Sequence, residues 1–208
     1  MTDYSEIMSR HPGSNDTQMR RAIAVEAARI MAEQGIEDFL LAKRKAADRY
    51  KVSDQSALPG NVEIEAALRE HQRLFRTDLH EQGLHALRTT ALRLMRLLRE
   101  FNPRLVGSVL SGSATATTEI NLHVFVDRAE QVSLRLDEHG INHRHAEKKY
   151  RYEPERQLSY PSFKFVAGNQ AIEVVAFPID GLRQAPCSAV DGKPMARAEL
   201  AQVEQLLK

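Results

Sequence analysis

Polar side chains with the chemistry of a binding or catalytic site alternate with apolar ones over residues 119–124. The acid Glu119, the amide Asn121 and the imidazole His123 are separated by Ile, Leu and Val. Successive side chains of a β-strand point to opposite faces, so the three polar groups are expected on one face and the apolar ones on the other. Carboxylate and amide oxygens are ligands of hard cations such as Mg²⁺. The spacing predicts a strand with a polar site on one face.

A further acid, Glu173, interrupts the otherwise apolar segment 171–177. A charge in an apolar strand needs a partner or a metal ion. If the two strands adjoin, Glu119, Asn121 and Glu173 are expected to open into one cleft and to hold Mg²⁺ against the phosphates of a nucleotide. Lys164, on another expected strand, is either the ionic partner of Glu173 or a nucleotide contact.

Small and hydroxylic residues precede this strand. Gly107 allows a ligand to approach the backbone closely. The hydroxyl of Ser108, with neighbouring amides, is suited to phosphate oxygens, and Ser111 adds another hydroxyl. We interpret these residues as candidate phosphate contacts.

Three short motifs occur in the order and approximate spacing of DNA polymerase β-type nucleotidyltransferases: Val106-Gly107-Ser108, Glu119-Ile120-Asn121-Leu122 and Ile172-Glu173-Val174. From Gly83 to roughly Pro178 the chain resembles this superfamily. The resemblance implies Mg²⁺ as cofactor and transfer of a nucleoside monophosphate from a nucleoside triphosphate to an acceptor. The implied catalytic and metal-binding residues are Glu119, Asn121 and Glu173, and the implied nucleotide-binding residues are Gly107, Ser108, Ser111 and Lys164.

Asn121 departs from the family pattern, because active members carry a carboxylate there. A neutral amide adds no charge and bridges two metal ions poorly. Two functions therefore remain: a nucleotidyltransferase, or a catalytically inactive relative that acts as a nucleotide- or protein-binding module. If the missing charge is what limits metal binding, Asn121→Asp should tighten binding of Mg²⁺-nucleotide.

The elements that must position these residues change in character at Pro103. Before it, apolar residues recur at helical spacing, with breaks at Gly35, Leu58-Pro59-Gly60 and Gly83. The expected helices are 16–31, 36–50, 61–75 and 84–101. After it, short segments rich in β-branched and aromatic residues predict strands, with a helix at 129–139 and a closing helix at 198–207. The expected strands are 104–110, 120–126, 143–152, 162–166 and 171–177.

This order predicts an α+β fold. A helical module, 1–80, precedes a nucleotidyltransferase-like domain, 81–208, which consists of a small mixed sheet with flanking helices. The strands near 104–110, 119–126 and 171–177 are expected to form one sheet. The N-terminal helices are the expected surface for a protein partner or for a second copy of the chain.

Composition restricts the remaining possibilities. The 208 residues hold 29 basic and 28 acidic side chains, and the lone Cys187 excludes an intrachain disulfide. The sequence lacks a long apolar run, so we expect a cytoplasmic protein without a membrane span. Near-zero net charge makes general attraction to nucleic acid weak. We interpret the arginine row from Arg88 to Arg99 as a solvated helix face, and the basic segment 143–151 as an edge strand, in preference to RNA contacts.

Overall fold

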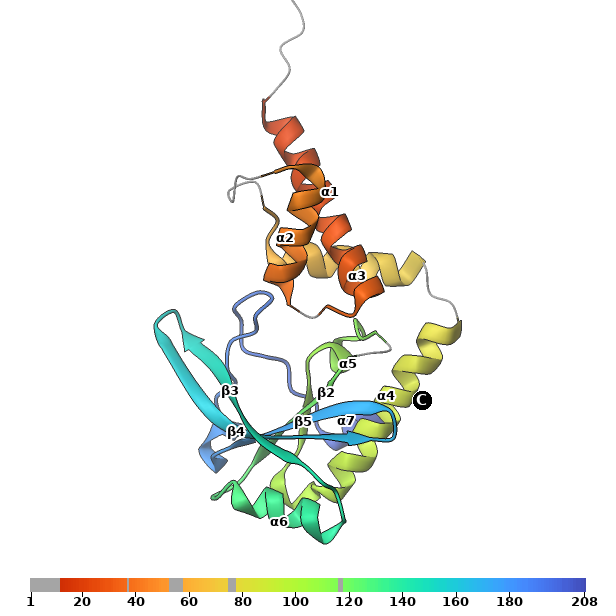
Figure 1. Ribbon diagram of the computed structural model, residues 1–208. Coiled ribbons are helices and arrows are strands. Elements are labelled where there is room, and N and C mark those ends of the chain that lie inside the picture. Colours follow the sequence, from red (N-terminus) through yellow and green to blue (C-terminus); the bar gives the residue numbers. More distant parts are fainter. Residues whose placement is uncertain (1–11, 37, 53–57, 75–77, 116–117) are drawn as a thin grey trace, which may run out of the picture. The chain divides into compact units, whose positions relative to one another are not determined.

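The computed structural model describes residues 12–36, 38–52, 58–74, 78–115 and 118–208 (Figure 1). Within these residues the chain forms seven α-helices and one five-stranded mixed sheet, which confirms the α+β class. It divides into two compact units, Met1–His71 and Gln72–Lys208. Each unit is described by itself.

The first unit is built from helices that share a small apolar core. They are α1 (Pro12–Gln34), α2 (Phe39–Tyr50) and the start of α3 (Asn61–Leu74). Ile23, Ile30 and Ile64 are buried in this core. The helix α1 stops before Gly35, as expected, since Gly35 adopts a positive φ of 65°. The expected continuation of the third helix to Phe75 lies outside the described residues.

The second unit contains the sheet, whose strands lie in the order β1-β2-β5-β4-β3. β2 and β5 are parallel, and the other neighbours are antiparallel. α6 (Glu130–Glu138) connects β2 to β3. The strands are β1 (Arg104–Val106), β2 (Ile120–Phe125), β3 (Arg144–Glu153), β4 (Arg156–Ala167) and β5 (Gln170–Phe177).

Among the expected boundaries that were wrong, three have a clear physical cause. The first strand stops at Val106, because Gly107 has φ 74° and ψ −156°, and the chain then enters the short helix α5 (Ser108–Ser111). The fourth strand is longer than expected, since its polar first half pairs with β3 in a long hairpin. Gly83 lies inside α4 (Asp78–Leu97), because the apolar stripe that continues through Leu84 and Leu87 outweighs the roughly 1 kcal/mol that glycine costs in a helix.

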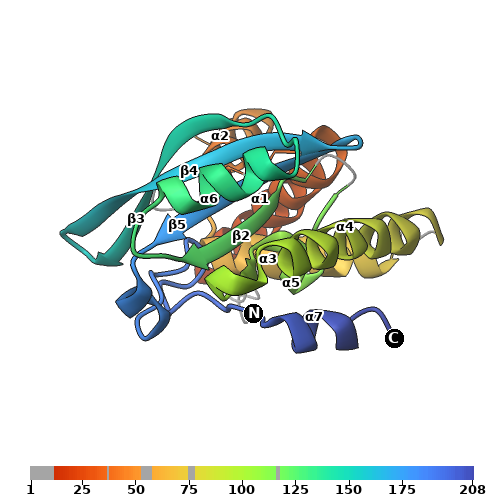
Figure 2. The same ribbon diagram turned by 90° about the horizontal axis from the view of Figure 1, so that it is seen from below.

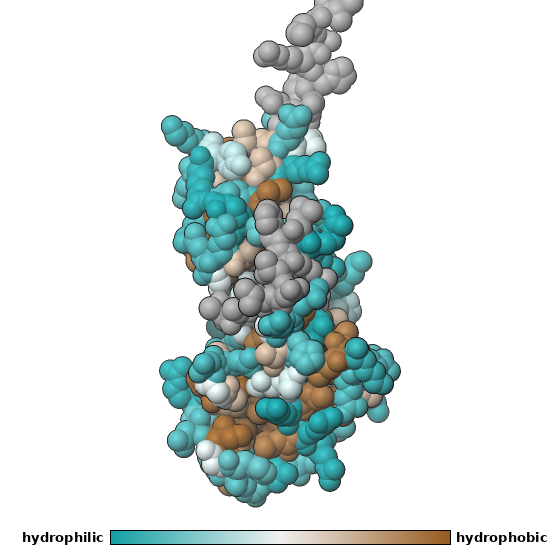
Figure 3. All heavy atoms as spheres, turned by 90° about the vertical axis from the view of Figure 1, so that its right-hand side faces the viewer, coloured by the Kyte–Doolittle hydropathy of each residue, from teal (hydrophilic) through white to brown (hydrophobic). Residues whose placement is uncertain are grey.

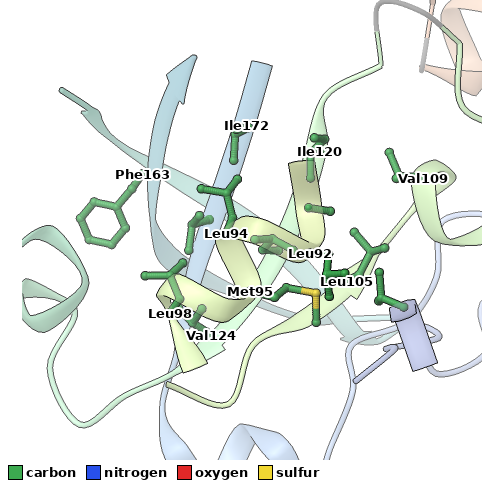
Figure 4. Close-up of a cluster of buried hydrophobic side chains, with 14 of the residues drawn as sticks. Leu92, Leu94, Met95, Leu98, Leu105, Val109, Ile120, Val124, Phe163 and Ile172 are labelled. Carbon is green, nitrogen blue, oxygen red and sulfur yellow. The ribbon is translucent and has the colours of Figure 1, made fainter. Parts of the chain in front are cut away.

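One face of the sheet packs on helices α4 and α6 (Figure 2). Met95 of α4 and Leu98, which follows this helix, belong to one core with Ile120 of β2 and Ile172 of β5, and all four are fully buried (Figure 4). The short helix α7 (Leu200–Gln205) adds Val203 to this core. The apolar half of the alternating β2 sequence thus faces the helices, and the polar half faces the other way.

The opposite face of the sheet carries a second, aromatic core. Phe125, Tyr150 and Phe177 are buried there around Val175. Tyr150 of β3 contacts His123 of β2, with ring centroids 5.2 Å apart, although β4 and β5 lie between these strands in the sheet order. The β3–β4 hairpin therefore curls over this face and brings the edge strand β3 to side chains of β2.

The molecular surface is mostly hydrophilic in the view of Figure 3, with an apolar area on the second unit that is surrounded by hydrophilic residues. Among the described residues, no helix has the length and apolar character needed to cross a membrane.

Candidate functional site

The sheet register aligns the candidate residues across four neighbouring strands. Val106 of β1 pairs with Asn121 of β2, which pairs with Glu173 of β5, which in turn pairs with Lys164 of β4. The expectation that the segments near 104–110, 119–126 and 171–177 form one sheet is confirmed. Glu119 directly precedes β2 and lies on the same face, since Lys164 contacts both Glu119 and Glu173.

Two lysine side chains occupy the space among these polar groups. Lys164 Nζ lies 3.3 Å from Glu119 Oε1 and 3.5 Å from Glu173 Oε1. Lys148 of β3 donates to Asn121 Oδ1 at 2.8 Å and to Glu173 Oε2. The curl of the hairpin explains how Lys148 reaches β2. Two carboxylates and two ammonium groups therefore form one network, and their charges balance.

The charge of Glu173 is maintained by this network. Its side chain is only 2% exposed, and burial by itself would raise the pKa of the carboxyl. The hydrogen bond from Lys148 and the charges of Lys148 and Lys164 outweigh burial and hold the Glu173 pKa below its ordinary value. Desolvation by itself would lower the pKa of Lys164, but the charges of Glu173 and Glu119 and their hydrogen bonds with the ammonium group outweigh it, so this pKa is raised.

The donor set present does not fit a divalent cation. A metal ion bound by Glu119, Asn121 and Glu173 would have to displace both ammonium groups from the oxygens that they contact. The Asn121 amide is also directed by two bonds, since its Nδ2 donates to the Glu119 carbonyl at 3.0 Å while its Oδ1 accepts from Lys148. The lysine ammonium groups therefore contact the oxygens that the resemblance implies as Mg²⁺ ligands.

The candidate phosphate contacts lie at the same end of the sheet. Gly107 follows the residue of β1 that pairs with Asn121, and a Cβ placed there would meet no atom within 4 Å in the described part of the chain, apart from its two chain neighbours. Ser111, the last residue of α5, makes a local contact, since its hydroxyl lies 2.9 Å from that of Ser113. Arg88 of α4 holds α5 in place by donating to the carbonyls of Val109 and Leu110. The interpretation of Arg88 as part of a solvated helix face was therefore wrong, because its side chain binds backbone of α5.

His123 shares the face of Asn121 but belongs to a buried structural network. Arg197 Nε donates to His123 Nδ1 at 3.2 Å, so the neutral ring carries its proton on Nε2 and donates it to the Tyr150 hydroxyl at 2.9 Å. Burial, then the charges of Arg197 and Lys148, hold the pKa of His123 well below its ordinary value. Arg197 also donates to the Gly181 carbonyl at 2.7 Å.

Neither the protein-family models nor the curated proteins searched show a match to this chain.

Sequence reasoning did not find two of the residues that decide this arrangement. The sequence places Lys148 in a basic edge strand, but its alternation with Tyr150 and Tyr152 also indicates that it shares their face. Arg197 lies in an irregular segment before α7, where spacing gives no indication of its contacts. The alternative that Lys164 is the partner of Glu173 agrees with the 3.5 Å separation of their charged groups.

Proposed function

We propose that this chain is a nucleotidyltransferase-like protein that does not transfer nucleotides and that retains the fold as a nucleotide-binding module. The order of the motifs and their meeting at one end of the sheet support the resemblance to the superfamily. The observation that carries the loss of catalysis is the pairing of Lys148 and Lys164 with Glu119, Asn121 and Glu173. Nucleotidyl transfer by the family's route needs a pair of metal ions on these oxygens.

Restoring the metal ions has a physical cost beyond the missing charge at Asn121. Glu173 is buried, and its charge is compensated by the two lysines, so both ammonium groups would have to move away before cations could enter. Lys148 and Lys164 are themselves about one-third exposed, at 33% and 36%, so the network is open to solvent on its lysine side. A ligand can therefore meet the ammonium groups more readily than the buried carboxylate.

The proposal is tested by incubating the full chain with α-labelled ATP, CTP or GTP and either Mg²⁺ or Mn²⁺. We expect pyrophosphate release and labelled product to equal those of Glu173→Gln, and calorimetry to detect binding of at least one nucleotide. Pyrophosphate release that depends on the metal ion and disappears in Glu173→Gln would overturn the loss of catalysis. Absence of binding for all three nucleotides would overturn the binding module.

A further inference from the structure

The two lysines have unused hydrogen-bonding capacity. An ammonium group has three N–H donors. In the described contacts, Lys148 directs two donors at Asn121 and Glu173, and Lys164 lies within reach of Glu119 and Glu173. One donor on each lysine remains for a ligand, on the side of the network that is open to solvent.

The two carboxylates differ in how easily they can move away from the lysines when a ligand arrives. Glu173 is fixed, since it is buried between both ammonium groups. The Glu119 side chain is 25% exposed and is held by one lysine at 3.3 Å, so it can turn toward water when an anion takes its place. An arriving anion thus loses little by displacing Glu119, whereas an arriving cation must displace two lysines.

We propose that this site binds a polyphosphate chain without a divalent metal, with Lys148 and Lys164 as its built-in cations. This inference rests on the proposed function. It adds that the phosphate chain is the part of the ligand that is recognised, and that Mg²⁺ weakens binding. Gly107 lies at the same end of the sheet, and a Cβ added there would meet no atom of the described residues within 4 Å apart from its chain neighbours, so a phosphate chain can approach this backbone. Mg²⁺ binds phosphate oxygens itself and neutralises them. It therefore weakens binding at this site.

The probe is inorganic tripolyphosphate, titrated by calorimetry into the full chain with EDTA or with excess Mg²⁺. We expect binding about tenfold tighter in EDTA, the effect of one charge-assisted hydrogen bond. Lys164→Gln should weaken binding in EDTA by a similar factor. Lys149→Gln is the matched control, since Lys149 is exposed, neighbours Lys148 in β3 and points to the other face, and it should leave binding unchanged.

The decisive variant is Glu119→Gln, because its two possible effects have opposite signs. If lysines bind the ligand, removing this acid frees Lys164 and tightens tripolyphosphate binding several-fold, a result that misfolding cannot produce. If a metal ion binds the ligand, the same change weakens binding. Tighter binding in Mg²⁺, weaker binding by Glu119→Gln or no binding of tripolyphosphate would each overturn the inference.

A parallel titration with ATP in EDTA distinguishes the sources of the phosphate chain. ATP that binds tighter than tripolyphosphate supports a nucleotide whose base adds contacts, and equal or weaker binding supports an inorganic chain. If ATP binds but tripolyphosphate does not, the polyphosphate inference fails while the nucleotide-binding module stands. If the chain releases pyrophosphate from ATP with Mg²⁺ and this release disappears in Glu173→Gln, the proposed function itself fails.

Discussion

Removal of Lys148 tests the network most directly. Lys148→Met keeps a side chain of similar length but withdraws the hydrogen bonds to Asn121 and to the buried Glu173. Breaking a buried ion pair typically costs about 3–5 kcal/mol when the remaining charge has no other partner. Here Lys164 remains 3.5 Å from Glu173, and Lys148 was one-third exposed. We therefore expect a loss of about 2 kcal/mol in the free energy of unfolding.

The assay is urea unfolding followed by near-UV circular dichroism. The chain has no tryptophan and five tyrosines. Tyr150, Tyr152 and Tyr160 belong to the aromatic core of the second unit, so the tyrosine signal follows the unit that holds the site. Lys149→Met is the control. Its side chain is exposed, and surface changes of this kind usually stay within about 0.5 kcal/mol.

The pH dependence of the free energy of unfolding is a second test, and its direction follows from the lowered pKa of Glu173. The pKa of Glu173 is lowered in the folded protein, so its contribution is fully present above the unfolded pKa of about 4.3 and is lost as the pH falls further. Lys148→Met removes the main cause of that lowering. The difference between parent and variant should therefore be largest near pH 7 and narrow below about pH 4.3. Equal stability of Lys148→Met and Lys149→Met at pH 7 would refute the reasoning.

Three further predictions follow from neighbouring features. Asn121→Asp should not by itself create measurable Mg²⁺ affinity in calorimetry, because Lys148 already lies 2.8 Å from this side chain and will pair with the new carboxylate; combining it with Lys148→Ala and Lys164→Ala should. Since the pKa of His123 is lowered on folding, the unfolded chain binds a proton before the folded chain does, and the free energy of unfolding should fall as the pH drops below about 6.5. In urea titrations, His123→Gln should flatten this dependence on pH. An unchanged dependence would exclude His123 as its origin. Gly107→Ala should lower the unfolding free energy by about 1–3 kcal/mol through backbone strain alone, because the added Cβ meets no atom of the described residues within 4 Å apart from its chain neighbours. Gly83→Ala inside α4 should raise the unfolding free energy by up to about 1 kcal/mol. Thermal melts of both variants check this pair, and the opposite order of stability would contradict it.

The sequence predicted the strand that carries Asn121 because polar and apolar residues alternate over 119–124, and the strand that carries Glu173 because 171–177 is otherwise apolar and β-branched. Both strands are in fact buried along almost their whole length. It also predicted that Asn121 shares a face with Glu119, which depends on local geometry alone. It did not predict Lys148 at this position, because that contact depends on the curl of a hairpin 27 residues further along the chain. The end of β1 was missed for a related reason, since a positive φ at Gly107 is allowed but not required by its sequence context.

The curl of the β3–β4 hairpin also has a consequence for the order of folding events. β4 and β5 lie between β3 and β2 in the sheet, so we expect the bonds between Lys148 and Asn121 and between Tyr150 and His123 to form late in folding. Contacts that form after the transition state act mainly on the rate of unfolding. In stopped-flow measurements, Lys148→Met should speed unfolding while leaving the refolding rate nearly unchanged. These bonds would then determine how long the second unit stays folded.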